Sequence, residues 1–382
     1  MLQLTTPEQI ASAMDGRLKQ IVPGRFEALL PAATVQNHAA FLSRNSHGLN
    51  CLWFGGSLEG KSDISIWRST LKHNVWSRAE QLTDDPLRSE QNPIQFDPMD
   101  GQQLILNTAQ PGGNQDECVV CMRAAGEAAV VLPLPKGTFI RGALTVREDG
   151  AWLLPLFRCV PRPGHRWTGS HDTAALAISA DKGKTWREVD VPGSIGCVHM
   201  TLVRLTSDHF AAFFRRRQAD FIYRTESTDG GETWSVPKAT DVPNNNSSIC
   251  PITMSDGRIA IACNPVNAAM HPNARREGLY DELGEDDNRP QAEGGCNPIW
   301  GVPRGPLSIC FSIDGGHTFP KRIVVEDGPG TCLTNNSIDG KNQEMSYPAL
   351  LEGPDGSLDL AYTYHRRAIK HVRLTKDWLD QQ

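Results

Sequence analysis

Three consecutive arginines, Arg215–Arg217, follow the apolar segment at residues 209–214. The composition of that segment is typical of a β-strand, in which Arg215 and Arg217 would share one face and Arg216 would take the other. Burying three adjacent positive charges is costly, so at least one of them has to meet water or an anion. A guanidinium group matches the geometry of a carboxylate. The sequence therefore indicates that the end of this strand faces water or an anionic group.

Other kinds of chemistry lack their sequence signatures. There is no HExxH motif, no pair of CxxC motifs, and no glycine-rich loop that leads into a helix as in a phosphate site. The single CxxC, Cys118 to Cys121, alternates like a strand, so its two thiols should face opposite sides. We therefore expect neither a metal nor a cofactor. The net charge of −6 argues against a nucleic-acid partner.

Short β-strands are the elements that must position these side chains. After residue 22 no long helical period occurs, and short apolar segments are bounded by Gly, Asp, Asn and Pro. Three segments share the pattern S-x-D-x-G-x-T-[WF], at residues 179–186, 227–234 and 312–319. In such a turn the Asp accepts hydrogen bonds from backbone amides, and the glycine supplies a left-handed conformation. The repetition predicts an array of similar hairpins.

The spacing of this repeat predicts a closed ring of sheets. Setting aside an irregular insertion at 267–302, the repeats recur about every 50 residues. The strand-rich chain therefore predicts an all-β fold, a β-propeller over residues 26–382 with six blades, or seven as the alternative. Residues 1–25 are predicted to be an N-terminal helical segment, because Thr6, Pro7 and Gln9 form a capping-box pattern.

The repeats resemble the Asp boxes of sialidases, and residues 30–375 resemble the BNR-repeat, sialidase-like (neuraminidase-like) family. Three later segments strengthen the resemblance: GAWLLP at 150–155, PNNNSS at 243–248 and YTYHRR at 362–367. The resemblance implies an exo-acting glycoside hydrolase that cleaves a terminal acidic sugar. Sialidases use a tyrosine as the nucleophile in place of a carboxylate.

The resemblance also implies roles for particular residues. Tyr347, in the segment MSYPAL, corresponds to the nucleophile, and Asp63 corresponds to the acid/base, with Glu59 as its rival. Arg304 and Arg215 correspond to arginines that bind the substrate carboxylate. Further substrate-binding residues are expected near strand ends, where a propeller presents them to its axis: Arg217, Arg141, Arg366, Asn92, His199, Asn246 and Tyr364.

The sequence departs from the family in the first strand. Sialidases carry Arg-Ile-Pro there, and that arginine belongs to the carboxylate clamp, whereas this chain has Gln36-Asn-His38-Ala-Ala40. His38 is expected either to substitute for that arginine, as an acid/base or as a hydrogen-bond donor, or to be a structural histidine of the first strand. Glu344 is expected to be a solvated loop carboxylate. Without the first arginine, the acidic sugar could instead be a uronic acid or a related ulosonic acid.

Two other functions stay open. In a lyase that acts on uronate-containing saccharides, His38 or Tyr364 would remove the proton next to the carboxylate while arginines neutralise its charge. Alternatively, the propeller binds sugars without turnover. An unsaturated product would separate a lyase from a hydrolase. Loss of turnover with retained binding in Tyr347→Phe would separate an enzyme from a lectin.

Composition also yields expectations about compartment and partners. The chain has no run of 18 apolar residues, which argues against a membrane-spanning helix, and its N-terminus lacks a signal-peptide pattern. Most of its ten cysteines lie in apolar segments, typical of reduced thiols. We therefore expect a cytoplasmic protein whose partner is an acidic carbohydrate. The 267–302 insertion is expected to cover the pocket or to form a contact in a homo-oligomer.

Overall fold

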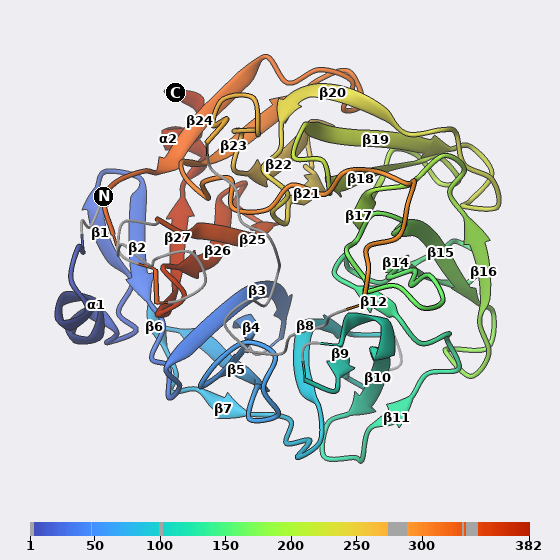
Figure 1. Cartoon of the computed structure of the whole chain (residues 1–382). Helices are drawn as coiled ribbons and strands as arrows, with labels where there is room; N and C mark the ends of the chain where they lie inside the picture. Colours follow the sequence, from blue (N-terminus) through green and yellow to red (C-terminus); the bar gives the residue numbers. More distant parts are fainter. Residues whose placement is uncertain are drawn as a thin grey trace.

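Six antiparallel sheets surround a central axis (Figure 1). The computed structural model describes residues 4–46, 48–98, 102–112, 114–273, 289–330, 332–333 and 343–382. The fold is a six-bladed β-propeller, as predicted, and the alternative of seven blades is wrong. No helix in these ranges has the length and apolar character needed to cross a membrane.

Each blade runs from an inner strand at the axis to outer strands at the rim. Blade 1 contains β3 (Gln36–Asn45), β4 (Gly48–Gly56), β5 (Ser65–Lys72), β6 (Val75–Trp76) and β7 (Glu80–Gln81). Blade 2 contains β8 (Ser89–Phe96), β9 (Leu104–Gln110), β10 (Val119–Ala124) and β11 (Val130–Val131), with a short 3-10 helix, η1 (Gln115–Glu117), before β10. Blade 3 contains β12 (Thr138–Ile140), β13 (Thr145–Val146), β14 (Trp152–Arg158), β15 (Thr173–Ser179) and β16 (Arg187–Asp190).

The remaining blades follow in chain order. Blade 4 contains β17 (Cys197–Arg204), β18 (Phe210–Arg216), β19 (Phe221–Ser227) and β20 (Lys238–Pro243). Blade 5 contains β21 (Cys250–Thr253), β22 (Ile259–Cys263), β23 (Leu307–Ser312) and β24 (Lys321–Glu326). Blade 6 contains β25 (Met345–Glu352), β26 (Leu358–Tyr364) and β27 (Ala368–Leu374), and it is completed by β2 (Arg25–Leu29) and β1 (Lys19–Val22).

Early and late segments of the chain together close the ring in blade 6. Strand β2 pairs antiparallel with β27, so residues from the start of the sequence form the outer part of the last sheet (Figure 1). Helix α1 (Pro7–Ala13) has the predicted capping box between Thr6 and Gln9. The helix is shorter than the predicted segment 1–25, because residues 19–22 and the start of β2 are strands of blade 6. A second helix, α2 (Lys376–Asp380), follows β27.

A buried ionic cluster lies where β2 meets β27 and blade 5. The Lys370 ammonium, which is fully buried, lies 2.5 Å from a carboxylate oxygen of Glu326 and 3.0 Å from one of Glu27. Tyr362 donates a hydrogen bond of 2.6 Å to Glu326, and Arg25 donates one of 2.7 Å to Glu27. The cluster therefore ties three strands of blade 6 to the outer strand of blade 5.

The S-x-D-x-G-x-T turns have the hydrogen bonds that the sequence predicts. In the turn after β15, Asp181 accepts bonds of 2.8 Å from the Thr185 amide and 2.6 Å from the Thr185 hydroxyl, and Ser179 accepts one of 2.7 Å from the Gly183 amide. The turns that begin at residues 227 and 312 repeat the same pattern. These turns stabilise the hairpins of blades 3 to 5.

Four inner strands share a β-bulge at the same place. Each of these strands, β3, β8, β17 and β25, pairs with the next strand in a register that shifts at a bulge near its N-terminal end. Each bulge contains one non-glycine residue in the left-handed region: Ala39, Asn92, His199 or Tyr347, with φ between 50 and 60°. Because a bulge redirects the side chain it carries, the ring offers equivalent positions around its axis.

Candidate active site

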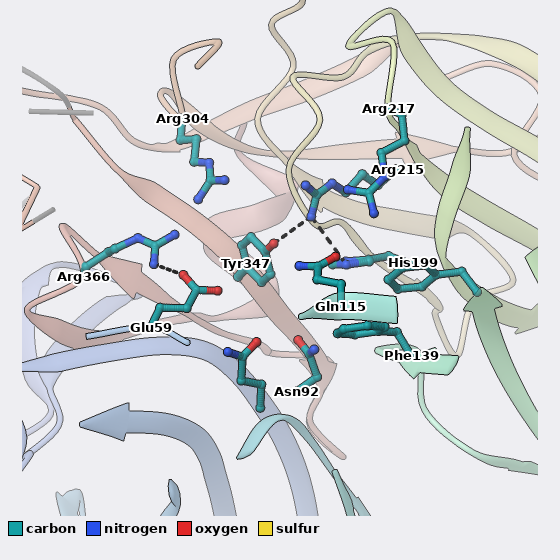
Figure 2. Close-up of a pocket in the computed structure, with 12 residues that line it drawn as sticks. Glu59, Asn92, Gln115, Phe139, His199, Arg215, Arg217, Arg304, Tyr347 and Arg366 are labelled. Carbon is teal, nitrogen blue, oxygen red and sulfur yellow. Dashed lines mark hydrogen bonds and ion pairs between the residues drawn. The ribbon is translucent and has the colours of Figure 1, made fainter. Parts of the chain in front are cut away.

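Residues from all six blades line one pocket on the axis of the propeller (Figure 2). The empty space at the pocket, including the part that opens to solvent, is about 450 Å³. Its lining combines four arginines, a tyrosine, a histidine, amides, two phenylalanines and one carboxylate: Glu59, Gln91, Asn92, Gln115, Phe139, Phe157, His199, Arg215, Arg217, Arg304, Tyr347 and Arg366. The bulges supply Asn92, His199 and Tyr347, whereas the other residues lie elsewhere in the strands or in the loops that join them.

Tyr347 lies between two cations. Its hydroxyl accepts a hydrogen bond of 2.7 Å from Arg215, and the Arg304 guanidinium lies 5.5 Å from the centre of its ring. Burial alone would raise the pKa of Tyr347, but the nearby positive charges of Arg215 and Arg304 outweigh burial and lower it below its usual value. The phenolate form is therefore stabilised in this pocket, which favours Tyr347 as a nucleophile or base.

Arg215 has no carboxylate partner among the described residues. Its guanidinium donates to Asn246 Oδ1 at 2.8 Å and to the Tyr347 hydroxyl, and it lies 3.4 Å from His199 Nε2. Burial, together with the charges of Arg217 and Arg304, lowers the pKa of Arg215 to about 10. The group remains cationic at neutral pH, and its charge is not neutralised by an acidic side chain of the described structure. This is the arrangement expected for an arginine that binds an anionic ligand.

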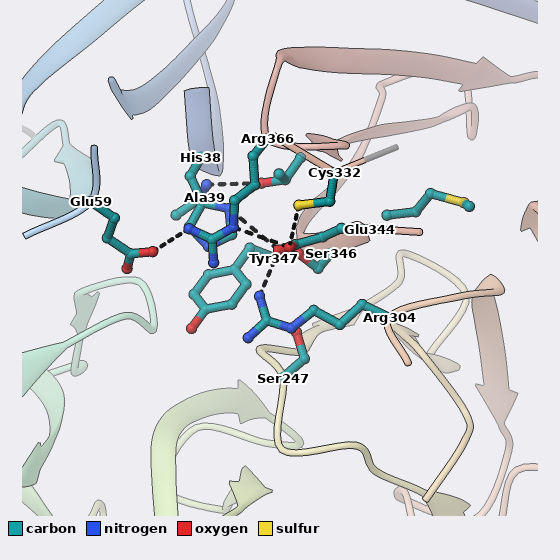
Figure 3. A network of polar contacts seen from close by, with 12 residues as sticks. His38, Ala39, Glu59, Ser247, Arg304, Cys332, Glu344, Ser346, Tyr347 and Arg366 are labelled. Atoms are coloured by element: carbon teal, nitrogen blue, oxygen red, sulfur yellow. Dashed lines mark hydrogen bonds and ion pairs between the residues drawn. The ribbon is translucent and has the colours of Figure 1, made fainter. Parts of the chain in front are cut away.

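A chain of alternating charges lies beside Tyr347 (Figure 3). Arg304 donates to Glu344 at 2.5 Å, Arg366 donates to the other Glu344 oxygen at 3.0 Å, and Arg366 also pairs with Glu59. Burial would raise the pKa of Glu344, but Arg304 and Arg366 hold it well below its usual value. The expectation that Glu344 is a solvated loop carboxylate is therefore wrong, since it is buried between two pocket arginines.

The three arginines of blade 4 separate as the strand pattern predicts. Arg215 and Arg217 both line the pocket, whereas Arg216 contacts Asp220 and the Tyr223 ring. Arg217 donates two hydrogen bonds, of 2.7 and 3.0 Å, to Asp172. In the described structure, the four pocket arginines therefore face three carboxylates, which leaves one positive charge in excess.

Two histidines flank Tyr347 in different ways. His199 lines the pocket, and its Nδ1 lies 3.1 Å from the Ser248 hydroxyl. His38 packs behind Tyr347, with ring centres 4.2 Å apart, and its Nδ1 bonds to the Thr363 hydroxyl at 2.8 Å. Burial, reinforced by nearby arginines, lowers the pKa of both histidines well below the usual value, so both are neutral at neutral pH. Contrary to the expected site role, His38 is not part of the pocket lining, because the Tyr347 side chain lies in front of it.

Three other residues predicted for the site lie outside the pocket lining. Asp63 is exposed, and its carboxylate accepts a hydrogen bond from the Ser57 amide, so Glu59 and not Asp63 is the carboxylate in the lining. Tyr364 points away from the pocket and donates to the Leu4 carbonyl. Arg141 donates to the carbonyls of Ala40, Tyr347 and Pro348, and so holds blades 1 and 6 together.

Asn246 also lies outside the lining, where it orients Arg215.

Several contributors to the site were not identified from the sequence. Gln91 directly precedes Asn92, and a bulge signal at the Asn-Pro pair could have indicated both. Gln115, Phe139, Phe157 and Asp172 show no local signal, because only the ring closure brings them to the axis.

The described end of the insertion packs on the pocket arginines. The Ile299 amide donates to the Arg217 carbonyl at 2.7 Å, and the Ile299 carbonyl accepts from Asn246 at 2.9 Å. The Trp300 ring lies 5.0 Å from the Arg217 guanidinium and 6.0 Å from that of Arg215. The described end of the insertion therefore lies beside the pocket arginines, and its role as a cover of the pocket or an oligomer contact stays a prediction. Residues 274–288 of the insertion lie outside the described residues.

Removing the Trp300 ring should loosen Arg215 and Arg217 without touching the reacting groups. We expect Trp300→Ala to raise KM for an acidic substrate about tenfold and to change kcat less than threefold. Steady-state kinetics on the purified protein measures both. Trp186→Ala, in the outer turn of blade 3, is the control that should leave KM unchanged. Equal effects of the two substitutions would contradict a role of Trp300 in placing the arginines.

The fold and the pocket together define the class of this protein: a six-bladed propeller with an arginine- and tyrosine-lined site on its axis. Residues 47–360 match the BNR repeat-like domain, and the chain belongs to this family. No curated protein sequence matches the chain. The resemblance to sialidase-like proteins is thereby confirmed at the level of family and fold.

Solved structures similar to this chain include sialidases. Hadza microbial sialidase Hz136 matches 90% of this chain and 66% of its own length, with a TM-score of 0.64 and 12% identity. A variant of NanB sialidase from Streptococcus pneumoniae matches 90% of this chain and 69% of its own, with the same TM-score and identity. A protein of unknown function from Dyadobacter fermentans matches 93% of this chain and all of its own, with a TM-score of 0.64 and 14% identity. At these identities the likeness shows the fold.

Proposed function

We propose that this protein is a glycosidase that cleaves a terminal acidic sugar from a glycoside or oligosaccharide. The observation that carries the proposal is Arg215, a buried arginine without a carboxylate partner among the described residues, whose guanidinium donates to the Tyr347 hydroxyl. The excess positive charge of the pocket suits a sugar with a single carboxylate. Arg215 would bind that carboxylate, and Arg304, beside the same tyrosine, would assist it.

The proposed reaction uses two groups of the pocket lining. The Tyr347 oxygen attacks the anomeric carbon as the bond to the leaving oxygen breaks, which forms a glycosyl–tyrosine intermediate. The phenol proton of Tyr347 passes to Glu59, the carboxylate of the lining, and Glu59 donates that proton to the leaving oxygen. Water then attacks the anomeric carbon, gives a proton to Glu59, and releases the tyrosine. Glu59 replaces Asp63 in this scheme.

One observation favours elimination as the second candidate function. Among the described residues, the Tyr347 hydroxyl contacts a cation and no carboxylate, and the lowered pKa of Tyr347 suits a base as well as a nucleophile. In that reaction Tyr347, as the phenolate, takes the proton next to a uronate carboxylate, the bond to the leaving oxygen breaks to give an alkene, and the leaving oxygen receives that proton from Tyr347. His38 and Tyr364, the bases that the sequence offered for a lyase, do not line the pocket.

A screen of acidic glycosides with product analysis tests the proposal. Hydrolysis adds the mass of water to the products, whereas elimination gives a conjugated alkene that absorbs in the ultraviolet. Arg215→Met is expected to lower kcat/KM for the acidic substrate at least about a hundredfold, because a desolvated charge pair is lost. Arg216→Met, on the opposite face of the same strand, is the matched control. Equal turnover of acidic glycosides and their methyl esters would reject a site built for a carboxylate.

A further inference from the structure

The pocket has a second pole, chemically distinct from its arginines. Gln91 and Asn92 of blade 2 line the pocket, and Figure 2 shows Asn92 on the side of the pocket opposite Arg304. The side chains of Gln91 and Asn92 are more than nine-tenths buried. A neutral amide buried beside a cationic wall has to find hydrogen-bond partners in the protein or in a ligand.

The hydrogen bonds of Asn92 fix which of its amide atoms faces the pocket. The Thr108 hydroxyl donates its proton to the Gln91 carbonyl at 3.0 Å, so toward Asn92 it can only accept. Asn92 Nδ2 is therefore the atom that bonds Thr108, at 3.2 Å. This leaves Asn92 Oδ1 as an acceptor without a partner among the described residues. Because Asn92 sits on the β8 bulge with φ at 50°, its backbone also directs it to the axis.

Gln91 also lines the pocket. Its Nε2 donates to the Ser89 hydroxyl at 3.1 Å, and its Oε1 has no partner among the described residues. Two pocket-lining residues thus carry a carbonyl oxygen without a partner among the described residues, whereas the arginines of the lining offer guanidinium donors. A carboxylate is repelled by the amide oxygens of Gln91 and Asn92 and attracted by the arginines, whereas sugar hydroxyl groups can donate to the amide oxygens.

We infer that Gln91 and Asn92 form a hydroxyl-reading subsite that selects a sugar with free hydroxyl groups on the side opposite its carboxylate. This inference rests on the proposed function, because it takes the carboxylate to bind at Arg215. The substrate class is a monoanionic, polyhydroxylated glycon. Sugars that carry sulfate or phosphate on that side are rejected, since they place an acceptor against an acceptor.

Binding of defined monosaccharides to the full chain tests the subsite. The probes are the methyl glycosides of glucuronate, galacturonate, N-acetylneuraminate and 3-deoxy-D-manno-octulosonate, measured by titration calorimetry. The tightest binder is then compared with its single deoxy analogues and with its uncharged carboxamide. The variant is Asn92→Gly, because glycine adopts a positive φ without strain. Gln95→Ala, a buried amide of the same strand outside the lining, is the matched control.

In the wild-type protein, at least one deoxy analogue should bind about tenfold more weakly than its parent. Asn92→Gly should bind the parent about tenfold more weakly and should no longer distinguish the two, whereas Gln95→Ala behaves as wild type. Gln91→Ala gives a second test if Asn92→Gly unfolds. Undiminished discrimination in the variants that fold overturns the subsite. Equal affinity for the acid and its carboxamide overturns the proposed function instead, and binding of none of the probes overturns both.

Discussion

Tyr347→Phe is expected to lower kcat for the acidic glycoside at least about a thousandfold while leaving its Kd within threefold. The phenylalanine keeps the ring that packs on His38 and Arg304 and removes only the oxygen that Arg215 contacts. Substrate binding persists, because the arginines remain. Single-turnover kinetics and calorimetric titration measure the two quantities separately.

The matched control for this prediction is Tyr364→Phe. That tyrosine belongs to the same blade, but its hydroxyl bonds to the Leu4 carbonyl away from the pocket, and burial raises its pKa to about 12. The Tyr364→Phe variant should turn over the acidic glycoside at the wild-type rate. Full activity of Tyr347→Phe would remove Tyr347 from the chemistry. A parallel loss in both variants would point to a general effect on the blade.

Lys370→Met is expected to lower the free energy of unfolding by about 3–5 kcal/mol, because it leaves Glu27 and Glu326 buried without their shared cation. The cluster joins β2, β26 and β27 to β24, so the loss should appear as opening of the seam between blades 5 and 6. Urea unfolding, followed by tryptophan fluorescence, measures the change, with hydrogen exchange locating it.

Lys376→Met provides the comparison for that measurement. Lys376 pairs with Asp380 on the surface of α2, where both side chains are more than half exposed, and its loss should cost less than about 1 kcal/mol. A change of under 1 kcal/mol in Lys370→Met would show that the methionine packs well enough to replace the ion cluster.

The fold was predictable because the information that specifies it recurs along the chain. Each S-x-D-x-G-x-T turn is local, and three copies reveal both the hairpin and the period. The roles assigned to Tyr347, Arg215 and Arg304 came from segments that resemble a family. The structure brings these three residues into one pocket, and their roles stay predictions.

The buried partners were harder to predict, because their environment depends on distant contacts. Glu344 is buried by Arg304 and Arg366, which are far from it in sequence, so its own neighbours gave no sign of burial. Glu59 and Asp63 lie in one loop, and sequence could not say which carboxylate enters the pocket. The bond from the Glu59 amide to Gln36 Oε1 and the ion pair with Arg366 select Glu59.

The four bulges have a consequence for how this ring can change. Asn92, His199 and Tyr347 occupy equivalent positions in the left-handed region, where the packing of the blades has to offset a cost of about 1–3 kcal/mol for each residue. The fourth equivalent position is occupied by Ala39, whose side chain is only a methyl group. A new reactive group can therefore arise by exchanging one side chain at a bulge position, while the strands that orient that side chain stay the same.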